Sequence, residues 1–191
     1  MTISDKNMNY KIIDKQTYYR SGVFRHFSED CKCSTSMTAR INVTALKKFS
    51  EDSGTKFYIN FLYVLAKVLN SREDYRMGYI WQTEELICYD QINPAQYIFH
   101  EDTETCTPVY TVYNVDYHVF YKDCAEDIRK AKETREYLLD MANHPNWFDA
   151  SYISWLSYDS LNIELPDGHL VAKVFKLLED EMSAFCNQYK N

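Results

Sequence analysis

The stretch Phe57–Asn70 constrains the fold of this chain most strongly. Apolar residues recur there at helical spacing, at positions 57, 61, 64, 65 and 68, so we expect a core helix that ends near Asn70. Segments rich in β-branched and aromatic residues lie on both sides of it in the sequence, and such segments favour strands. A helix with a broad apolar face is buried by packing on a sheet or on other helices. The stretch therefore predicts an α/β domain.

The other expected elements alternate along the chain. Strands are predicted at Met37–Val43, Arg76–Trp81, Glu85–Tyr89, Gln96–His100, Val109–Tyr113 and Tyr152–Tyr158. Helices are predicted at Ala45–Phe49 with Thr44 as the cap, and at Asp123–Asn143 with an apolar seam of Ile128, Ala131, Leu138 and Leu139. The last helix has Asp167 as its cap and a stripe of Val171, Val174, Phe175, Leu178, Met182 and Phe185. The expected fold is a two-layer α/β sandwich of a mixed β-sheet and a helix layer.

Composition limits the domain count and the classes of partner. The 191 residues include only four Gly and four Pro, so no linker is expected and residues 1–191 are predicted to form a single domain. The net charge of -7 argues against non-specific nucleic-acid binding. That charge also gives an anionic cofactor no long-range attraction, so a coenzyme A site needs local basic groups.

The sequence also predicts the cellular compartment. No apolar run approaches the ~20 residues that a membrane span needs, and the N-terminal residues lack the apolar core of a signal peptide. We therefore expect no membrane association, a cytoplasmic location and reduced cysteines. Cys31 and Cys33 do not have the spacing of a zinc knuckle, and no second pair completes a site, so no metal is expected.

Four stretches of the chain resemble chloramphenicol acetyltransferase. They are Lys56–Asn70, Tyr75–Trp81, Phe99–Cys106 and Ser151–Ile163, within a similarity that extends from about Asn9 to Tyr189. The resemblance implies that family's fold and a homotrimer with active sites in the clefts between subunits. It also implies an antibiotic-resistance enzyme, an acyltransferase that moves an acetyl group from acetyl-coenzyme A, its co-substrate, to the primary hydroxyl of chloramphenicol.

The same resemblance assigns catalytic roles. In the family a histidine of a late motif takes the hydroxyl proton as general base. Ser151 falls at the serine that helps to hold the oxyanion, and Arg20 at the arginine that pairs with the aspartate of the late motif, here Asp167. Read without the resemblance, Ser151 is a serine satisfied locally at a strand start, Arg20 is a surface charge and Asp167 is a helix cap.

The resemblance also implies an apolar pocket for the drug. The matching positions are Phe27, Cys31, Cys33, Thr35, Cys106, Leu161 and Ile163. Thr35 and Cys106 stand where phenylalanine is usual, which predicts a looser and slightly more polar pocket. The alternative is that these residues belong to an ordinary core or subunit interface.

The late motif is interrupted in this chain. The position of the general base holds Ile163, and Leu161–Gly168 runs directly into His169. The simplest account is an internal deletion near residues 163–169, joined at a repeated Asp-Gly. Acetyl transfer is then expected to be lost or strongly reduced, unless His169 serves as a substitute base. The alternative is a non-catalytic ligand-binding or assembly protein on the same fold.

Overall fold

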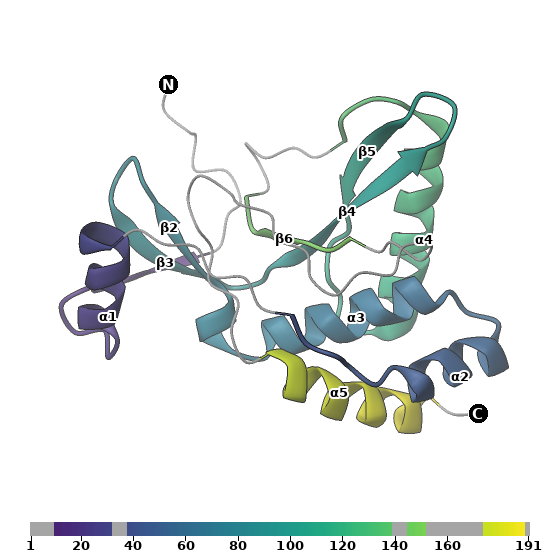
Figure 1. Ribbon diagram of the computed structural model, residues 1–191, viewed down its shortest axis with the longest axis horizontal. Helices are drawn as coiled ribbons and strands as arrows, with labels where there is room; N and C mark the ends of the chain where they lie inside the picture. The colour runs from purple at the N-terminus through teal and green to yellow at the C-terminus, as the bar shows by residue number, and fades with distance from the viewer. Residues whose placement is uncertain (1–9, 32–37, 139–144, 152–173, 190–191) are drawn as a thin grey trace.

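Two short sheets and a layer of helices organise the computed structural model, which describes residues 10–31, 38–138, 145–151 and 174–189 (Figure 1). The first sheet is antiparallel, in the order β1 (Tyr10–Ile13), β3 (Glu85–Tyr89), β2 (Met77–Ile80). The second has the order β5 (Thr105–Tyr110), β4 (Asn93–His100), β6 (Trp147–Asp149), with β6 parallel to β4. Strands of both directions are therefore present, as the predicted mixed sheet requires.

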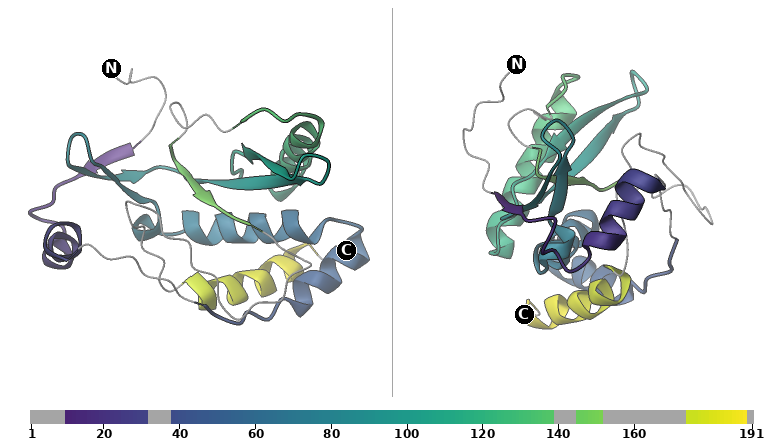
Figure 2. Two further views of the ribbon diagram at one scale, coloured as in Figure 1. Left: turned by 45° about the horizontal axis from the view of Figure 1, so that its top comes forward. Right: turned by 90° about the vertical axis from the view of Figure 1, so that its left-hand side faces the viewer.

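The helices lie mainly on one side of these strands. Figure 2 shows α2 (Thr44–Ser53), α3 (Phe57–Asn70) and α5 (Val174–Gln188) together beneath the sheets. The helix α4 (Tyr117–Glu133) packs on α3, β4 and β5. Two short elements complete the description: α1 (Ser21–Arg25) continues into the π-helix η1 (His26–Asp30), and the 3-10 turn η2 (Glu73–Tyr75) follows α3. The two-layer α/β architecture is thus confirmed.

The core lies between the helices and is rich in aromatic rings. Phe185 of α5 is fully buried, and its ring centroid lies 5.0 Å from that of Phe49, 5.5 Å from that of Tyr63 and 4.9 Å from that of Tyr117. These four rings come from α5, α2, α3 and α4, respectively. Aromatic pairs at such separations add to the free energy of burial. One cluster therefore joins all four long helices.

A buried polar network lies inside the same core. The Asn60 amide donates to Ser50 Oγ at 2.9 Å and to Thr55 Oγ1 at 2.7 Å, and Tyr117 Oη donates to Asn60 Oδ1 at 2.8 Å. Asn60 is fully buried, and a buried amide is stable only when its polar atoms are paired in this way. The network joins α2, α3 and α4 at their packed ends.

Several predicted element boundaries were correct. The helix Phe57–Asn70 and the strand Glu85–Tyr89 are confirmed to the residue, and the strand pair with β2 is confirmed. The predicted stripe of α5 is confirmed at Leu178, Met182 and Phe185, which are all buried. The strand Tyr152–Tyr158, the cap Asp167 and Val171 lie outside the described residues, as do the side chains of Val174 and Phe175.

Other predictions were wrong in position. The helix expected from Asp123 begins earlier, at Tyr117, and ends at Glu133, so Leu138 is not helical. Its N-cap is Asp116, whose Oδ1 accepts from the backbone N–H groups of His118 at 2.8 Å and Val119 at 3.3 Å. The first turn was missed because its buried residues are aromatic, and such residues are also typical of strands.

The segment before α2 also differs from its prediction. Residues 38–43 form no strand, although Ile41 and Val43 pack on the core as their alternation suggested. Thr44 is the first residue of α2 and not its cap; Asn42 Oδ1 accepts from the Thr44 N–H at 3.0 Å. The second sheet also differs from its prediction. The strand expected at Val109–Tyr113 is β5, which starts at Thr105 and ends at Tyr110.

None of the helices in the described part of the chain is long and apolar enough to cross a membrane.

Candidate active site

Three of the predicted site residues lie on or beside one short helical segment. Arg20 directly precedes α1, Phe27 lies in η1, and Cys31 directly follows it. The Cys31 N–H donates to the His26 carbonyl at 2.8 Å, which closes the wide π-helical turn. Phe27 is 44% exposed and Cys31 is also exposed. The segment therefore presents both predicted pocket residues to solvent.

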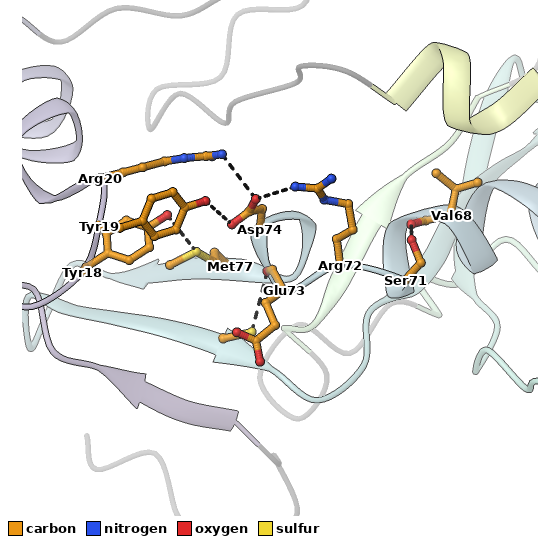
Figure 3. A network of polar contacts seen from close by, with 10 residues as sticks. Tyr18, Tyr19, Arg20, Val68, Ser71, Arg72, Glu73, Asp74 and Met77 are labelled. Atoms are coloured by element: carbon orange, nitrogen blue, oxygen red, sulfur yellow. Dashed lines mark hydrogen bonds and ion pairs between the residues drawn. The ribbon is translucent and has the colours of Figure 1, made fainter.

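Arg20 binds a carboxylate that the sequence analysis did not single out. Its Nη2 lies 3.4 Å from Asp74 Oδ2, and its guanidinium lies 4.8 Å from the ring centroid of Tyr19. The Tyr19 hydroxyl donates to Asp74 Oδ1 at 3.0 Å, and Arg72 Nη2 lies 3.1 Å from Asp74 Oδ2. Figure 3 shows the side chains of Tyr19, Arg20 and Arg72 converging on Asp74. The predicted partner Asp167 lies outside the described residues, so that pairing stays a prediction.

The charge balance around Asp74 stabilises its ionised form. Burial by itself raises the pKa of this carboxyl, but hydrogen bonds from Arg72 and Tyr19 and the charges of Arg20 and Arg72 lower it further than burial raises it. The net result is a pKa below the ordinary value of 3.8. Asp74 is therefore an anion at neutral pH, and its contribution to stability is lost only as the pH falls through this lowered pKa.

Ser151, the predicted oxyanion residue, stands where the chain leaves β6. The preceding residue is held on two sides: the Ala150 N–H donates to the Ala95 carbonyl at 2.8 Å, and Tyr58 Oη donates to the Ala150 carbonyl at 2.9 Å. Ser151 itself is exposed. The parallel pairing of β6 with β4 therefore anchors the backbone directly before an exposed serine.

Cys106 lies on the β4–β5 hairpin, opposite Phe99, and is exposed. The turn is held from outside by Arg135, whose Nη2 donates to both carboxylate oxygens of Asp102, at 2.8 and 2.7 Å. Beside it, His100 is buried and its Nε2 lies 2.7 Å from Thr107 Oγ1. The burial of His100 against Thr107 fits a structural role.

The structure does not bring all predicted site residues together within one chain. Figures 1 and 2 place α1 and the β4–β5 hairpin at opposite ends of the molecule. The α1–η1 segment carries Phe27 and the hairpin carries Cys106, so the two predicted pocket segments are separated within one chain. The other predicted residues lie outside the described residues: Cys33, Thr35, Leu161, Ile163, Asp167 and His169. Their assignments stay predictions.

Two hollows in the described part of the chain lie away from these residues. One of about 270 Å³ is lined by Val109, Tyr110, Val112, Asp127, Lys130 and Leu138. The other, of about 210 Å³, is lined by Lys47, Ser50, Glu51, Thr55, Lys56 and Phe57. Among the described residues, no group of three or more His, Cys, Asp or Glu side chains is placed to hold a metal ion.

Sequence comparison places these residues in a family. The profile of the family described as chloramphenicol acetyltransferase matches residues 8–182. A chloramphenicol acetyltransferase of Clostridium butyricum is 30% identical over 158 residues, which are 83% of this chain and 72% of the relative. One of Proteus mirabilis is 30% identical over 178 residues, which are 90% of this chain and 78% of the relative.

Structural comparison gives the same result for the fold. A solved chloramphenicol acetyltransferase superposes with a TM-score of 0.72, covering 93% of this chain and 100% of the other chain, at 16% sequence identity. The similarity covers nearly the whole chain and therefore includes both sheets and the helix layer.

Proposed function

Because the chain belongs to the chloramphenicol acetyltransferase family, we propose that it keeps the family's binding cleft but transfers acetyl groups only slowly. The observation that carries this proposal is Ile163, which stands where the family motif has its general base. An isoleucine side chain has no atom that can accept a proton. The acceptor hydroxyl must then attack the thioester without the proton transfer that normally assists it.

The parts of the site that remain support binding of both substrates. Ser151 is exposed directly after an anchored backbone segment, so its hydroxyl is accessible for the proposed role of oxyanion donor. Phe27 and Cys31 are exposed on the α1–η1 segment, where they can contact an apolar acceptor. The proposed substrates are acetyl-coenzyme A and chloramphenicol or a similar alcohol, in line with the names of the relatives.

The lengths of the relatives support the proposed deletion. The aligned stretch is 83% of this chain but only 72% of the Clostridium butyricum relative, so that relative is the longer protein. The interrupted motif at Leu161–His169 is where such a shortening would remove the base. Removal of neighbouring strands would expose unpaired N–H and C=O groups at the edges that remain.

Binding is tested by the effect of each ligand on thermal unfolding. Chloramphenicol and coenzyme A are each expected to raise the melting temperature, because a ligand that binds only the native state stabilises it by about 2.7 kcal/mol at 100 times its Kd. Phe27→Ala is expected to weaken chloramphenicol binding about tenfold or more, through the loss of buried ring area. Since Phe27 is 44% exposed in the chain, the melting temperature without ligand should change little.

Val23→Ala is the matched control. Val23 lies on the same helical segment and is 60% exposed, but it is not a predicted pocket residue. Chloramphenicol should therefore bind this variant as it binds the unaltered protein. Absence of any ligand effect on the unaltered, folded protein would mean that the cleft has been lost and that the family relationship describes ancestry only.

A second role, assembly into the trimer implied by the family resemblance, is favoured by one surface. Tyr97 and Phe99 alternate along β4 with the less exposed Gln96, Ile98 and His100 and are 42% and 48% exposed. Cys106 lies opposite Phe99 on the same face of the hairpin. Aromatic side chains exposed in a row are typical of an interaction surface. In a trimer, a residue of this hairpin can meet a residue of another subunit's α1–η1 segment, which a single chain keeps apart.

The trimer is tested by sedimentation equilibrium. The unaltered protein is expected to have three times the chain mass of 22.7 kDa. Phe99→Lys should reduce the mass to that of one chain, because it places a charge in the proposed interface. Val119→Lys, at a position that is 41% exposed on α4, should leave the mass unchanged. A measured mass of one chain for the unaltered protein would contradict this proposal.

A further inference from the structure

We propose that Asp74 is a positioning residue: it anchors Tyr19 and Arg20, and through them it sets the place of the α1–η1 segment that carries Phe27 and Cys31. This inference deepens the proposed function and rests on it only where ligand binding is concerned. It also assigns Arg20 a partner other than Asp167, the one that the sequence pattern predicted.

The carboxylate of Asp74 receives three donors from two separate segments. Tyr19 Oη donates to Oδ1 at 3.0 Å, while Arg20 Nη2 lies 3.4 Å and Arg72 Nη2 3.1 Å from Oδ2. The Asp74 side chain is only 18% exposed, whereas those of Arg20 and Arg72 are 49% and 52% exposed. A carboxylate that is mostly shielded from water and bonded on both oxygens is held more firmly than an ordinary surface ion pair.

The anchor is itself tied to the body of the molecule. Asp74 lies in η2, which follows the end of α3, and the Arg76 N–H closes that turn on the Glu73 carbonyl at 2.9 Å. The Arg76 side chain donates to the Asn70 carbonyl at the end of α3 and to the Tyr89 carbonyl of β3, the latter at 2.9 Å. The position of Asp74 is therefore set by both the helix layer and the first sheet.

The segment that Asp74 holds has few other attachments in the described part of the chain. No residue of α1 or η1 is buried. Phe24 contacts Tyr79 with ring centroids 5.4 Å apart, and just before α1, Tyr18 Oη donates to Met77 Sδ at 3.4 Å. A short helix without a buried face keeps its place only through such contacts. Figure 3 shows that the Asp74 contacts lie at the residues where the chain enters α1.

The arrangement explains how Arg20 can be retained when the late motif is interrupted. In the family pattern this arginine braces the loop that carries the histidine. Here the Arg20 guanidinium binds the carboxylate of Asp74, which lies 54 residues further along the chain. Through Asp74, the arginine then orders the segment that carries Phe27 and Cys31.

The test measures amide hydrogen exchange of residues 21–31 in the full chain without ligand. Asp74→Asn is expected to accelerate exchange there about tenfold, because it removes the charge on which three donors converge. Arg20→Gln should have a similar effect, and the double variant should add little, since both changes break one interaction. Asp74→Glu should restore most of the protection. Asp167→Asn should leave exchange unchanged and show no coupling to Arg20→Gln.

Glu73→Gln is the matched control. It breaks the neighbouring ion pair between Glu73 and Lys11 of β1, which does not involve the α1–η1 segment, so exchange at residues 21–31 should stay as it was. Unchanged exchange in Asp74→Asn, or coupling of Arg20 to Asp167 in place of Asp74, would overturn the proposal.

Chloramphenicol binding gives the second readout. Asp74→Asn is expected to weaken binding about tenfold while Glu73→Gln does not, because only the former displaces Phe27 and Cys31. Faster exchange with unchanged affinity would show that Asp74 anchors the segment but does not position the acceptor, and this would overturn the positioning role. Failure of the unaltered protein to bind chloramphenicol would refute the proposed function; the exchange and coupling results, which use no ligand, would still decide whether Asp74 is the anchor.

Discussion

Thiol release from acetyl-coenzyme A in the presence of chloramphenicol is expected to be about 10²–10⁴ times slower with this protein than with a relative that carries the family histidine. That range is the usual contribution of a positioned general base to the rate. The prediction follows from the proposal that Ile163 takes the position of the base, because an isoleucine side chain cannot accept a proton. The measurement is a steady-state assay of free thiol with and without the drug, on protein shown to be folded.

His169→Ala and Ser151→Ala separate the possible origins of any remaining rate. If Ile163 marks a true loss of the base, His169→Ala should leave the slow rate unchanged. Ser151→Ala should lower it further, since an oxyanion donor acts even without a base. Drug-dependent release at an ordinary enzyme rate would contradict the proposal, and its abolition by His169→Ala would identify that histidine as a substitute base.

Phe185→Ala is expected to lower the free energy of unfolding by about 3–5 kcal/mol, the usual cost of truncating a buried aromatic side chain. The ring is fully buried and contacts Phe49, Tyr63, Tyr117 and Tyr189. Because Phe49, Tyr63 and Tyr117 lie on three separate helices, the cavity cannot be filled by the movement of one side chain. Urea denaturation followed by circular dichroism gives the change directly.

The control for this substitution is Val115→Ala, at a position that is 80% exposed. Its effect is expected to stay within about 0.5 kcal/mol. A loss below about 1 kcal/mol for Phe185→Ala would mean that α5 does not pack between the other helices as described. The experiment therefore also tests whether the helix that follows the interrupted motif reaches its place in the core.

The accuracy of each structural prediction depended on the kind of sequence pattern on which it was based. The bounds of α3 were predicted correctly because its apolar residues recur at helical spacing. Of the positions in the predicted stripe, Val64 and Val68 are buried, while Phe57, Phe61 and Leu65 are only partly buried. The start of α4 was missed because Tyr117 and Phe120 are aromatic residues that suit strands equally well. Residues 38–43 alternate like a strand but form none, since alternation does not provide a neighbouring strand to pair with.

The candidate site shows the same distinction. The family could be recognised in the sequence, and the resemblance singled out Ser151 and Ile163, because each depends on residue identity at a position. Ser151 was expected at the start of a strand, whereas the structure places it after β6. The role of Asp74 could not, since nothing in the run Arg72–Asp74 indicates which distant side chain it meets. The run lies between the predicted end of a helix near Asn70 and the predicted strand from Arg76, and it was assigned no role.

By itself, the sequence determined the family and the central helix, and it is the basis for the proposed loss of the general base, since these depend on residue types and on their local spacing. Only the tertiary structure decided which carboxylate holds Arg20 and which rings surround Phe185. Arg20 and Asp74 are 54 residues apart in the chain, and a hydrogen bond between them requires that the turn after α3 and the entry to α1 be brought together by the packing of all the elements between.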